Sequence, residues 1–126
     1  MNIFILDTNI ELCAQYHCDK HVVKMITEHA QMLSTACRAF GLNVGYNSTH
    51  VNHPCSKWVR ESIDNYLWLI DMTHYLHEEW RYRYGHSSNK YHKAYEIIET
   101  LPFPEFLPDI GLTPFAQAMP QKFHVS

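Results

Sequence analysis

The segment DKHVVKMITEHAQMLSTACRAF, residues 19–40, decides the fold that we expect for this chain. Its apolar residues recur every three or four positions, a spacing that places side chains on one face of an α-helix. Asp19 is a good N-cap residue, and Gly41 follows at the position that favours glycine after a helix. The segment therefore predicts one long helix from Lys20 to Phe40. Its apolar face comprises Val22, Met25, Ile26, Ala30, Met32, Leu33, Ala36 or Cys37, and Phe40.

One side of this helix carries a row of polar side chains. Glu28 follows His21 by seven residues, which is almost two turns at 3.6 residues per turn, so both project from the same side. An exposed Lys24–Glu28 pair at this spacing contributes only about 0.2–0.5 kcal/mol. The row is therefore either a solvated stripe or one side of a functional site. Its members are Asp19, Lys20, His21, Lys24, Glu28 and Gln31, with His17 before them.

The sequence before this helix predicts two short elements. Residues 2–6 (NIFIL) form a short apolar run with β character, which predicts a strand. Residues 8–11 (TNIE) match a capping box and predict a short helix through Tyr16.

A second helical region follows the turn-rich loop at residues 41–53. Pro54 suits the first turn of a helix, and the stretch from Cys55 to Tyr84 is apolar on nearly all sides, which predicts a central position. Ser62, Asp64 and Asn65 mark a weak point where this stretch can divide in two. A further helix from Lys90 to Leu101 is expected, with its cap within residues 87–89.

Residues 101–126 differ in character from the helical part of the chain. Pro102, Pro104 and Pro108 exclude a long helix there, while several apolar residues argue against a free tail. We expect an extended segment packed across the helices. The fold class predicted for residues 1–126 is thus an all-α, compact, single-domain helical bundle with a short N-terminal strand and an extended, proline-rich C-terminal segment.

Composition narrows the classes of function. The chain has 126 residues and a formal net charge of −3 with histidines neutral. Proteins that bind duplex DNA usually carry a marked positive excess, so an extended DNA-binding surface is disfavoured. A small anionic ligand would need only two or three well-placed cations. The ten histidines add positive charge at mildly acid pH.

The chain lacks the sequence features of membrane or exported proteins. No apolar run approaches the length of a membrane span, and MNIFILDTN at the start lacks the pattern of a signal peptide. Cys13, Cys18, Cys37 and Cys55 form no C-x-x-C pair, as expected of free thiols in a reducing compartment. We expect a cytoplasmic protein without membrane contact and without a cofactor.

Metal binding is the alternative that the histidines and cysteines raise. His17 and His21 have the i, i+4 spacing of helical ligands, and His53 and Cys55 could add two more. H-E-x-x-H is absent, however, and no fixed quartet of ligands stands out. We therefore assign no metal site, and a metal-dependent protein remains a third hypothesis.

A second polar cluster lies at residues 49–54 (THVNHP), on the loop that leads into the second helical region. The free N–H groups at a helix start attract anions, and Lys57 and Arg60 follow within two turns. This pattern predicts a phosphate site that includes His50. The simpler interpretation is that Asn52 and His53 only cap the helix.

Two motifs together resemble one known family. D-K-H-x6-E at residues 19–28 and N-H-P-x3-W at residues 52–58 resemble the pyrimidine-dimer DNA glycosylase family, of the endonuclease V type, and related small phage proteins. Members of that family are mostly helical single domains. They cut the glycosidic bond at ultraviolet-damaged pyrimidines, with the N-terminal α-amine as nucleophile and a glutamate on the first long helix.

The resemblance implies roles for particular residues of this chain. Glu28 would be the catalytic carboxylate, His21 the site histidine, and residues 52–54 would face the same cleft. Asn2 is bulky, so we expect Met1 to be retained and its amine to serve as the nucleophile. The family is basic and carries arginines where this chain has Thr27 and Gln31.

Two functional hypotheses follow from these observations. The first is a DNA base glycosylase and AP lyase that acts on damaged or modified pyrimidines through Glu28, His21 and Met1. The second is a non-catalytic phage protein that sequesters a small nucleotide or another phosphorylated ligand as an anti-defence sponge. If the chain is phage-encoded, it acts in the host-cell cytoplasm, and a homo-oligomer is among the open alternatives. The ligand-binding residues predicted for either case are Lys20, Lys24, Gln31, His50, Asn52, His53, Lys57 and Arg60.

Overall fold

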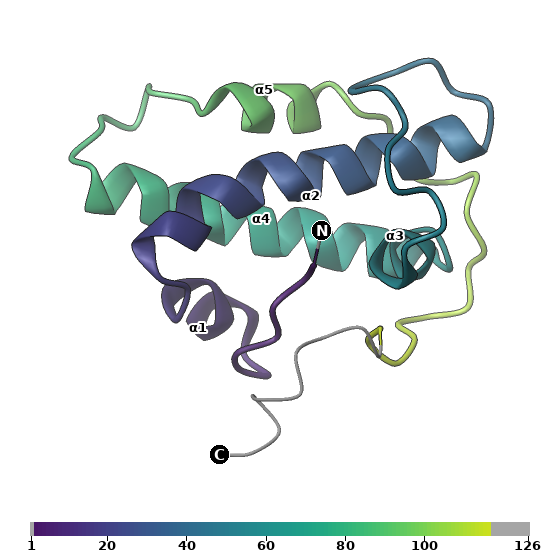
Figure 1. Ribbon diagram of the computed structural model, residues 1–126, viewed down its shortest axis with the longest axis horizontal. Helices are drawn as coiled ribbons and strands as arrows, with labels where there is room; N and C mark the ends of the chain where they lie inside the picture. The colour runs from purple at the N-terminus through teal and green to yellow at the C-terminus, as the bar shows by residue number, and fades with distance from the viewer. Residues whose placement is uncertain (1, 117–126) are drawn as a thin grey trace.

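Two long helices, α2 (Asp19–Ala39) and α4 (Ile63–Arg83), lie side by side and antiparallel at the centre of the molecule (Figure 1). The computed structural model describes residues 2–116. Within that range the chain is helical, which confirms the all-α fold class. The three shorter helices are α1 (Ile10–Gln15), α3 (Pro54–Val59) and α5 (Lys93–Glu99).

The core forms between the apolar faces of α2 and α4. Val22, Ile26 and Leu33 of α2 are fully buried, as the spacing of apolar residues predicts. They belong to one cluster with Leu69 and Leu76 of α4. Burial of one such side chain contributes about 1.5–3 kcal/mol, so this interface holds the two helices rigidly together. Within residues 2–116, no helix is both long enough and apolar enough to cross a membrane.

The ends of α2 differ slightly from the prediction. Asp19 is the first residue of the helix and not its N-cap, a position that Cys18 occupies. The physical reason is that Asp19 Oδ1 lies 3.0 Å from Arg83 Nη1 and binds α4. At the other end the helix stops at Ala39, and Gly41 adopts a positive φ of 87° as predicted.

Two other helix starts follow local capping chemistry. Asn9 caps α1 by accepting a 3.0 Å hydrogen bond from the Leu12 N–H, so the cap lies one residue after the predicted Thr8. Ser62 caps α4 by accepting a 3.0 Å hydrogen bond from the Asn65 N–H. This cap confirms that the predicted stretch from Cys55 to Tyr84 divides into two helices.

Helix α5 is shorter than the predicted helix from Lys90 to Leu101. His92 caps it by accepting a hydrogen bond from the Ala94 N–H at 3.1 Å, so residues 87–89 do not serve as the cap. His77 accepts the His92 N–H at 3.0 Å, and Arg81 Nε donates to the Lys90 carbonyl at 2.8 Å. These contacts with α4 hold residues 90–92 outside the helix.

The predicted strand at residues 2–6 is not formed, and the described range contains no strand at all. A strand needs a neighbouring strand for its backbone hydrogen bonds, and helices surround this segment instead. Its backbone bonds to a side chain of α1. The Cys13 thiol donates to the Phe4 carbonyl at 3.2 Å, and its sulfur accepts the Leu6 N–H at 3.3 Å.

The C-terminal segment, described to residue 116, crosses the start of α4 without a helix, as predicted. The Pro108 carbonyl accepts the Ile63 N–H at 2.9 Å, and Trp58 Nε1 donates to the Thr113 carbonyl at 3.2 Å. The packing is incomplete, since Phe103 and Ile110 remain 61% and 67% exposed.

Candidate functional site

A small pocket lies where residues 2–6, the N-terminal segment, meet the polar row of α2. Its volume is about 90 Å³. Three predicted site residues, His21, Lys24 and Glu28, come together there. The full lining is Asn2, Phe4, His21, Lys24, Met25 and Glu28.

The geometry of α2 places the charged groups of this pocket. Glu28 stands two turns after His21, and Lys24 lies one turn before Glu28 with its Nζ 3.7 Å from Glu28 Oε2. The Glu28 side chain is only 17% exposed, whereas that of Lys24 is 61% exposed. A contact of this length to a largely exposed lysine is screened by water. The pocket therefore presents a half-buried carboxylate with an exposed cation at its rim.

The N-terminal segment closes the opposite side of the pocket. The ring of Phe4 stacks on the His21 imidazole, with a centroid distance of 4.8 Å and an interplanar angle of 14°. The His17 ring meets Phe4 edge-on at 6.0 Å. The N-terminal segment thus lies directly against the polar row. From the sequence, this side of the site was expected to consist of α2 alone.

Buried groups fix the backbone of this segment. Ile3 is fully buried, and its backbone hydrogen-bonds the Cys55 thiol at the start of α3. Burial raises the pKa of the Cys13 and Cys55 thiols. Both therefore stay protonated, and the Cys13 thiol can donate to the Phe4 carbonyl.

Two buried histidines lie near the pocket-forming helix: His29 within α2 and His17 in the turn before it. His29 Nδ1 lies 2.9 Å from Thr73 Oγ1, and burial lowers the pKa of His29 to about 3. His17 Nδ1 donates to the Cys13 carbonyl at 2.8 Å, and burial lowers the pKa of His17 as well. Both imidazoles are therefore neutral near pH 7. No group of three or more potential metal ligands occurs within residues 2–116.

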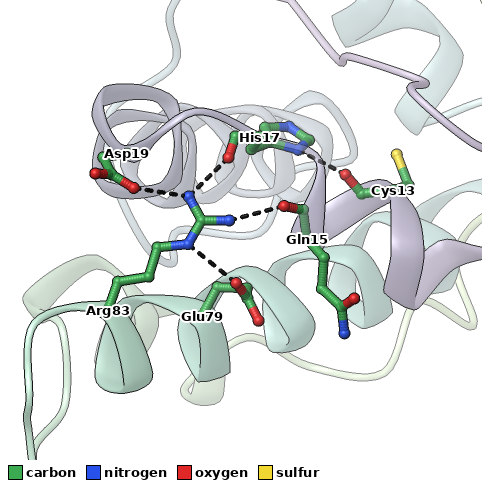
Figure 2. A network of polar contacts seen from close by, with 6 residues as sticks. All are labelled: Cys13, Gln15, His17, Asp19, Glu79 and Arg83. Atoms are coloured by element: carbon green, nitrogen blue, oxygen red, sulfur yellow. Dashed lines mark hydrogen bonds and ion pairs between the residues drawn. The ribbon is translucent and has the colours of Figure 1, made fainter.

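Arg83, at the end of α4, anchors the turn that precedes the polar row (Figure 2). Its guanidinium donates to the carbonyls of His17 and Gln15 at 2.7 and 2.8 Å. It also pairs with Asp19 and Glu79, each at 3.0 Å. Sequence reasoning missed this residue, because nothing local to Arg83 shows which distant carbonyls it meets.

The family model described as pyrimidine dimer DNA glycosylase matches residues 1–92. The chain belongs to this family. No curated protein and no solved structure matches it.

The matched residues of this glycosylase family member include helices α1 to α4, the N-terminal segment and the whole pocket. Helix α5 begins at Lys93, directly after the matched residues, and the C-terminal segment also lies beyond them. Met1, predicted as the nucleophile, lies outside the described residues.

The second polar cluster of this family member, residues 49–54 with Arg60 after them (the loop cluster), does not line the small pocket. His53 caps α3, because its Nδ1 accepts the Cys55 N–H at 3.0 Å, which matches the simpler interpretation for this residue. Arg60 donates to the Val51 carbonyl at 2.8 Å. His50 and Asn52 are exposed, and His50 has a positive φ of 49°.

Three further predicted residues lie outside the small pocket. Lys20 is exposed at the start of α2, and Gln31 is half-buried one turn beyond Glu28. Lys57 lines a different pocket of about 440 Å³, which α3 forms with the C-terminal segment. The lining of that pocket is Pro54, Lys57, Trp58, Glu61, Pro114, Phe115 and Ala116.

Proposed function

We propose that this protein is a DNA base glycosylase with AP lyase activity that acts on damaged or modified pyrimidines. The family match over residues 1–92 supports the reaction class. The observation that carries the proposal is that Asn2 and Glu28 line the same pocket. The N-terminal segment and the half-buried carboxylate thus meet at one place.

The nucleophile of this reaction is the α-amine of Met1. Consecutive Cα atoms are about 3.8 Å apart, so covalent geometry keeps this amine within about 5 Å of the Asn2 Cα. An α-amine has an ordinary pKa of about 7.7–8.0, so part of it is unprotonated at neutral pH. An unprotonated amine is the form that attacks carbon.

The reaction then runs through a covalent imine. The amine attacks C1′ of the deoxyribose, and the bond from C1′ to the base breaks. The base leaves with the bonding electron pair and takes a proton. The nitrogen loses a proton to Glu28, the C1′–O4′ bond breaks with its electron pair going to O4′, and O4′ takes up that proton, which gives a protonated imine between the amine and C1′. Loss of a C2′ proton expels the 3′ phosphate, and water hydrolyses the imine to return the amine.

Two residues of the α2 row have roles in these steps. The Glu28 carboxylate accepts the proton that the attacking nitrogen loses and stabilises positive charge at C1′. His21 forms the adjacent side of the pocket. A volume of about 90 Å³ is below the roughly 300–1,000 Å³ of small-molecule pockets. The pocket is thus suited to the reacting atoms of one sugar, while the bases lie outside it.

Borohydride trapping tests the proposal, because it reduces the imine to a stable cross-link. The substrate is an oligonucleotide duplex with one pyrimidine dimer, with an abasic duplex in parallel. We expect a cross-link with the wild type and a rate lowered roughly 10²- to 10⁴-fold in Glu28→Gln. The matched control Glu96→Gln, an exposed residue of α5, keeps the rate. A wild type that forms no cross-link with either duplex would sink the proposal.

A second candidate function rests on the pocket of about 440 Å³, which is the size of a small-molecule site. Lys57 supplies a cation there, and Pro54 and Phe115 supply apolar faces. The protein would then sequester a small nucleotide without cutting DNA. Thermal-shift measurements with nucleotides test this candidate. It requires stabilisation that Lys57→Ala abolishes and Lys93→Ala keeps, and the absence of any stabilisation would contradict it.

A further inference from the structure

We propose that Phe4 is a positioning residue for the N-terminal amine. Its ring, which contacts the rings of both His21 and His17, fixes the N-terminal segment along the pocket. This inference rests on the proposed glycosylase function. It adds a residue that has no reactive group and that acts through the geometry of the segment alone.

The ring of Phe4 contacts two other rings, one on α2 and one in the turn before that helix. It is nearly parallel to His21 at 4.8 Å, and His17 meets it at an angle of 68°. His17 is itself held, because its Nδ1 donates to the Cys13 carbonyl. A stacked face and an edge contact together define both the position and the tilt of a ring.

The backbone around Phe4 is fixed by separate contacts. The Cys13 thiol bonds the Phe4 carbonyl at 3.2 Å and the Leu6 N–H at 3.3 Å, which holds the segment on the α1 side. Ile3 is fully buried and its backbone bonds the Cys55 thiol, which holds the segment on the α3 side. The Phe4 ring makes the third contact, which holds the segment against the polar row of α2. Its loss leaves the segment free to shift away from Glu28.

The chemistry requires such precision because the nucleophile stands at a chain end. Each residue brings two soft backbone dihedrals, so an unanchored terminus samples many positions. Bond formation needs the reacting atoms about 3–3.5 Å apart, and a misplacement of about 1 Å can cost roughly 100-fold in rate. We therefore expect the rate of imine formation, and not DNA affinity, to depend on the Phe4 ring.

Single-turnover trapping with three variants tests this inference. Phe4→Leu removes the flat ring, and we expect its trapping rate at saturating DNA to fall roughly 10- to 100-fold. We expect its DNA dissociation constant to stay within threefold of the wild type. Phe4→Tyr keeps the ring and restores the rate. Phe106→Leu is the matched control, since Phe106 is a half-buried ring against Phe40 at 5.4 Å and lines no part of the pocket. It keeps the wild-type rate.

The outcomes separate this inference from the proposed function. A wild type without any cross-link refutes the proposed function. A wild type that cross-links while Phe4→Leu does so at the same rate refutes the positioning role alone. Equal losses in Phe4→Leu and Phe4→Tyr also contradict it, because the ring is then not what matters. If Phe4→Leu is unfolded by circular dichroism, Phe4→Met takes its place and must show the same loss of rate.

Discussion

The two polar clusters of the sequence differ in what their side chains do in the structure. On α2, His21, Lys24 and Glu28 project from one side of a rigid helix and line a pocket with the N-terminal segment. In the loop cluster, His53 caps α3 and Arg60 binds a loop carbonyl. A helix satisfies its own backbone and leaves its side chains available, whereas a loop uses side chains to satisfy its backbone. The same residue types therefore have different functions in the two places.

We expect the largest effect when one residue from each cluster is replaced and the trapping rates of the two variants are compared. Glu28→Gln should lower the trapping rate roughly 10²- to 10⁴-fold, since it removes the proton acceptor at the pocket. Asn52→Ala, an exposed residue of the loop cluster, should stay within about twofold of the wild type. Comparable losses in both variants would show that the loop cluster belongs to the site and would break the distinction.

The next effect is on stability and concerns Arg83, which holds the turn that precedes the polar row of α2. Arg83→Ala removes hydrogen bonds to two carbonyls and two carboxylates, and should lower the free energy of unfolding by about 2–4 kcal/mol. Arg60→Ala loses one bond to the Val51 carbonyl and should cost at most about 1.5 kcal/mol. Urea denaturation monitored by circular dichroism measures both values. An Arg83→Ala cost no larger than that of Arg60→Ala would contradict the role of the anchor.

The inner side of α2 should make stability depend on pH. Burial lowers the pKa of His29 to about 3 in the folded state, while the unfolded chain has a histidine pKa of about 6.5. The unfolded state therefore binds more protons between these values, and the stabilisation from neutral His29, complete above about pH 6.5, is lost as the pH falls toward 3.

The magnitude of this dependence is about 1.4 kcal/mol per pH unit for one histidine. Urea denaturation at pH 7.5, 6.0 and 5.0 should show the loss, and His29→Gln should show a shallower slope. An unchanged slope in His29→Gln would assign the pH dependence to other groups, such as His17, whose pKa burial also lowers.

The smallest effect belongs to the loop cluster itself. His53→Ala removes the α3 cap and should cost about 1 kcal/mol of stability, as for other N-cap losses, with the trapping rate within about twofold of the wild type. His92→Ala is the matched comparison, because His92 caps α5 in the same way. A large loss of rate in His53→Ala with little loss of stability would make His53 a site residue and not a cap.

Periodicity was enough to predict most of the helices. The apolar spacing of residues 19–40 and the break at Ser62 are local signals, and both match the structure. The seven-residue step from His21 to Glu28 is also local, so it predicted that the two residues project from one side of the helix, and in the structure both line one pocket. Asp19 was placed one position off, because its true partner, Arg83, lies 64 residues away in the sequence.

The contribution of the N-terminal segment could not be predicted from periodicity. NIFIL has the composition of a strand. Residues 2–116 contain no second strand to pair with it, and the sequence alone does not reveal this. The Cys13 thiol hydrogen-bonds the backbone of this segment instead, and the His21 ring stacks on Phe4. Both contacts depend on how α1 and α2 pack. Asn2 and Phe4 were therefore missed as pocket residues, although the resemblance pointed to the amine beside them.

The most direct test of a site built from the N-terminal amine and Glu28 is to locate the trapped cross-link on the chain. After borohydride reduction with an abasic duplex and nuclease digestion, peptide mass spectrometry assigns the modified amine. We expect modification of the α-amine of residue 1, with Lys24 of the same pocket unmodified. Modification at Lys24, or a cross-link rate that Glu28→Gln leaves unchanged, would contradict a site built from the N-terminal segment and Glu28.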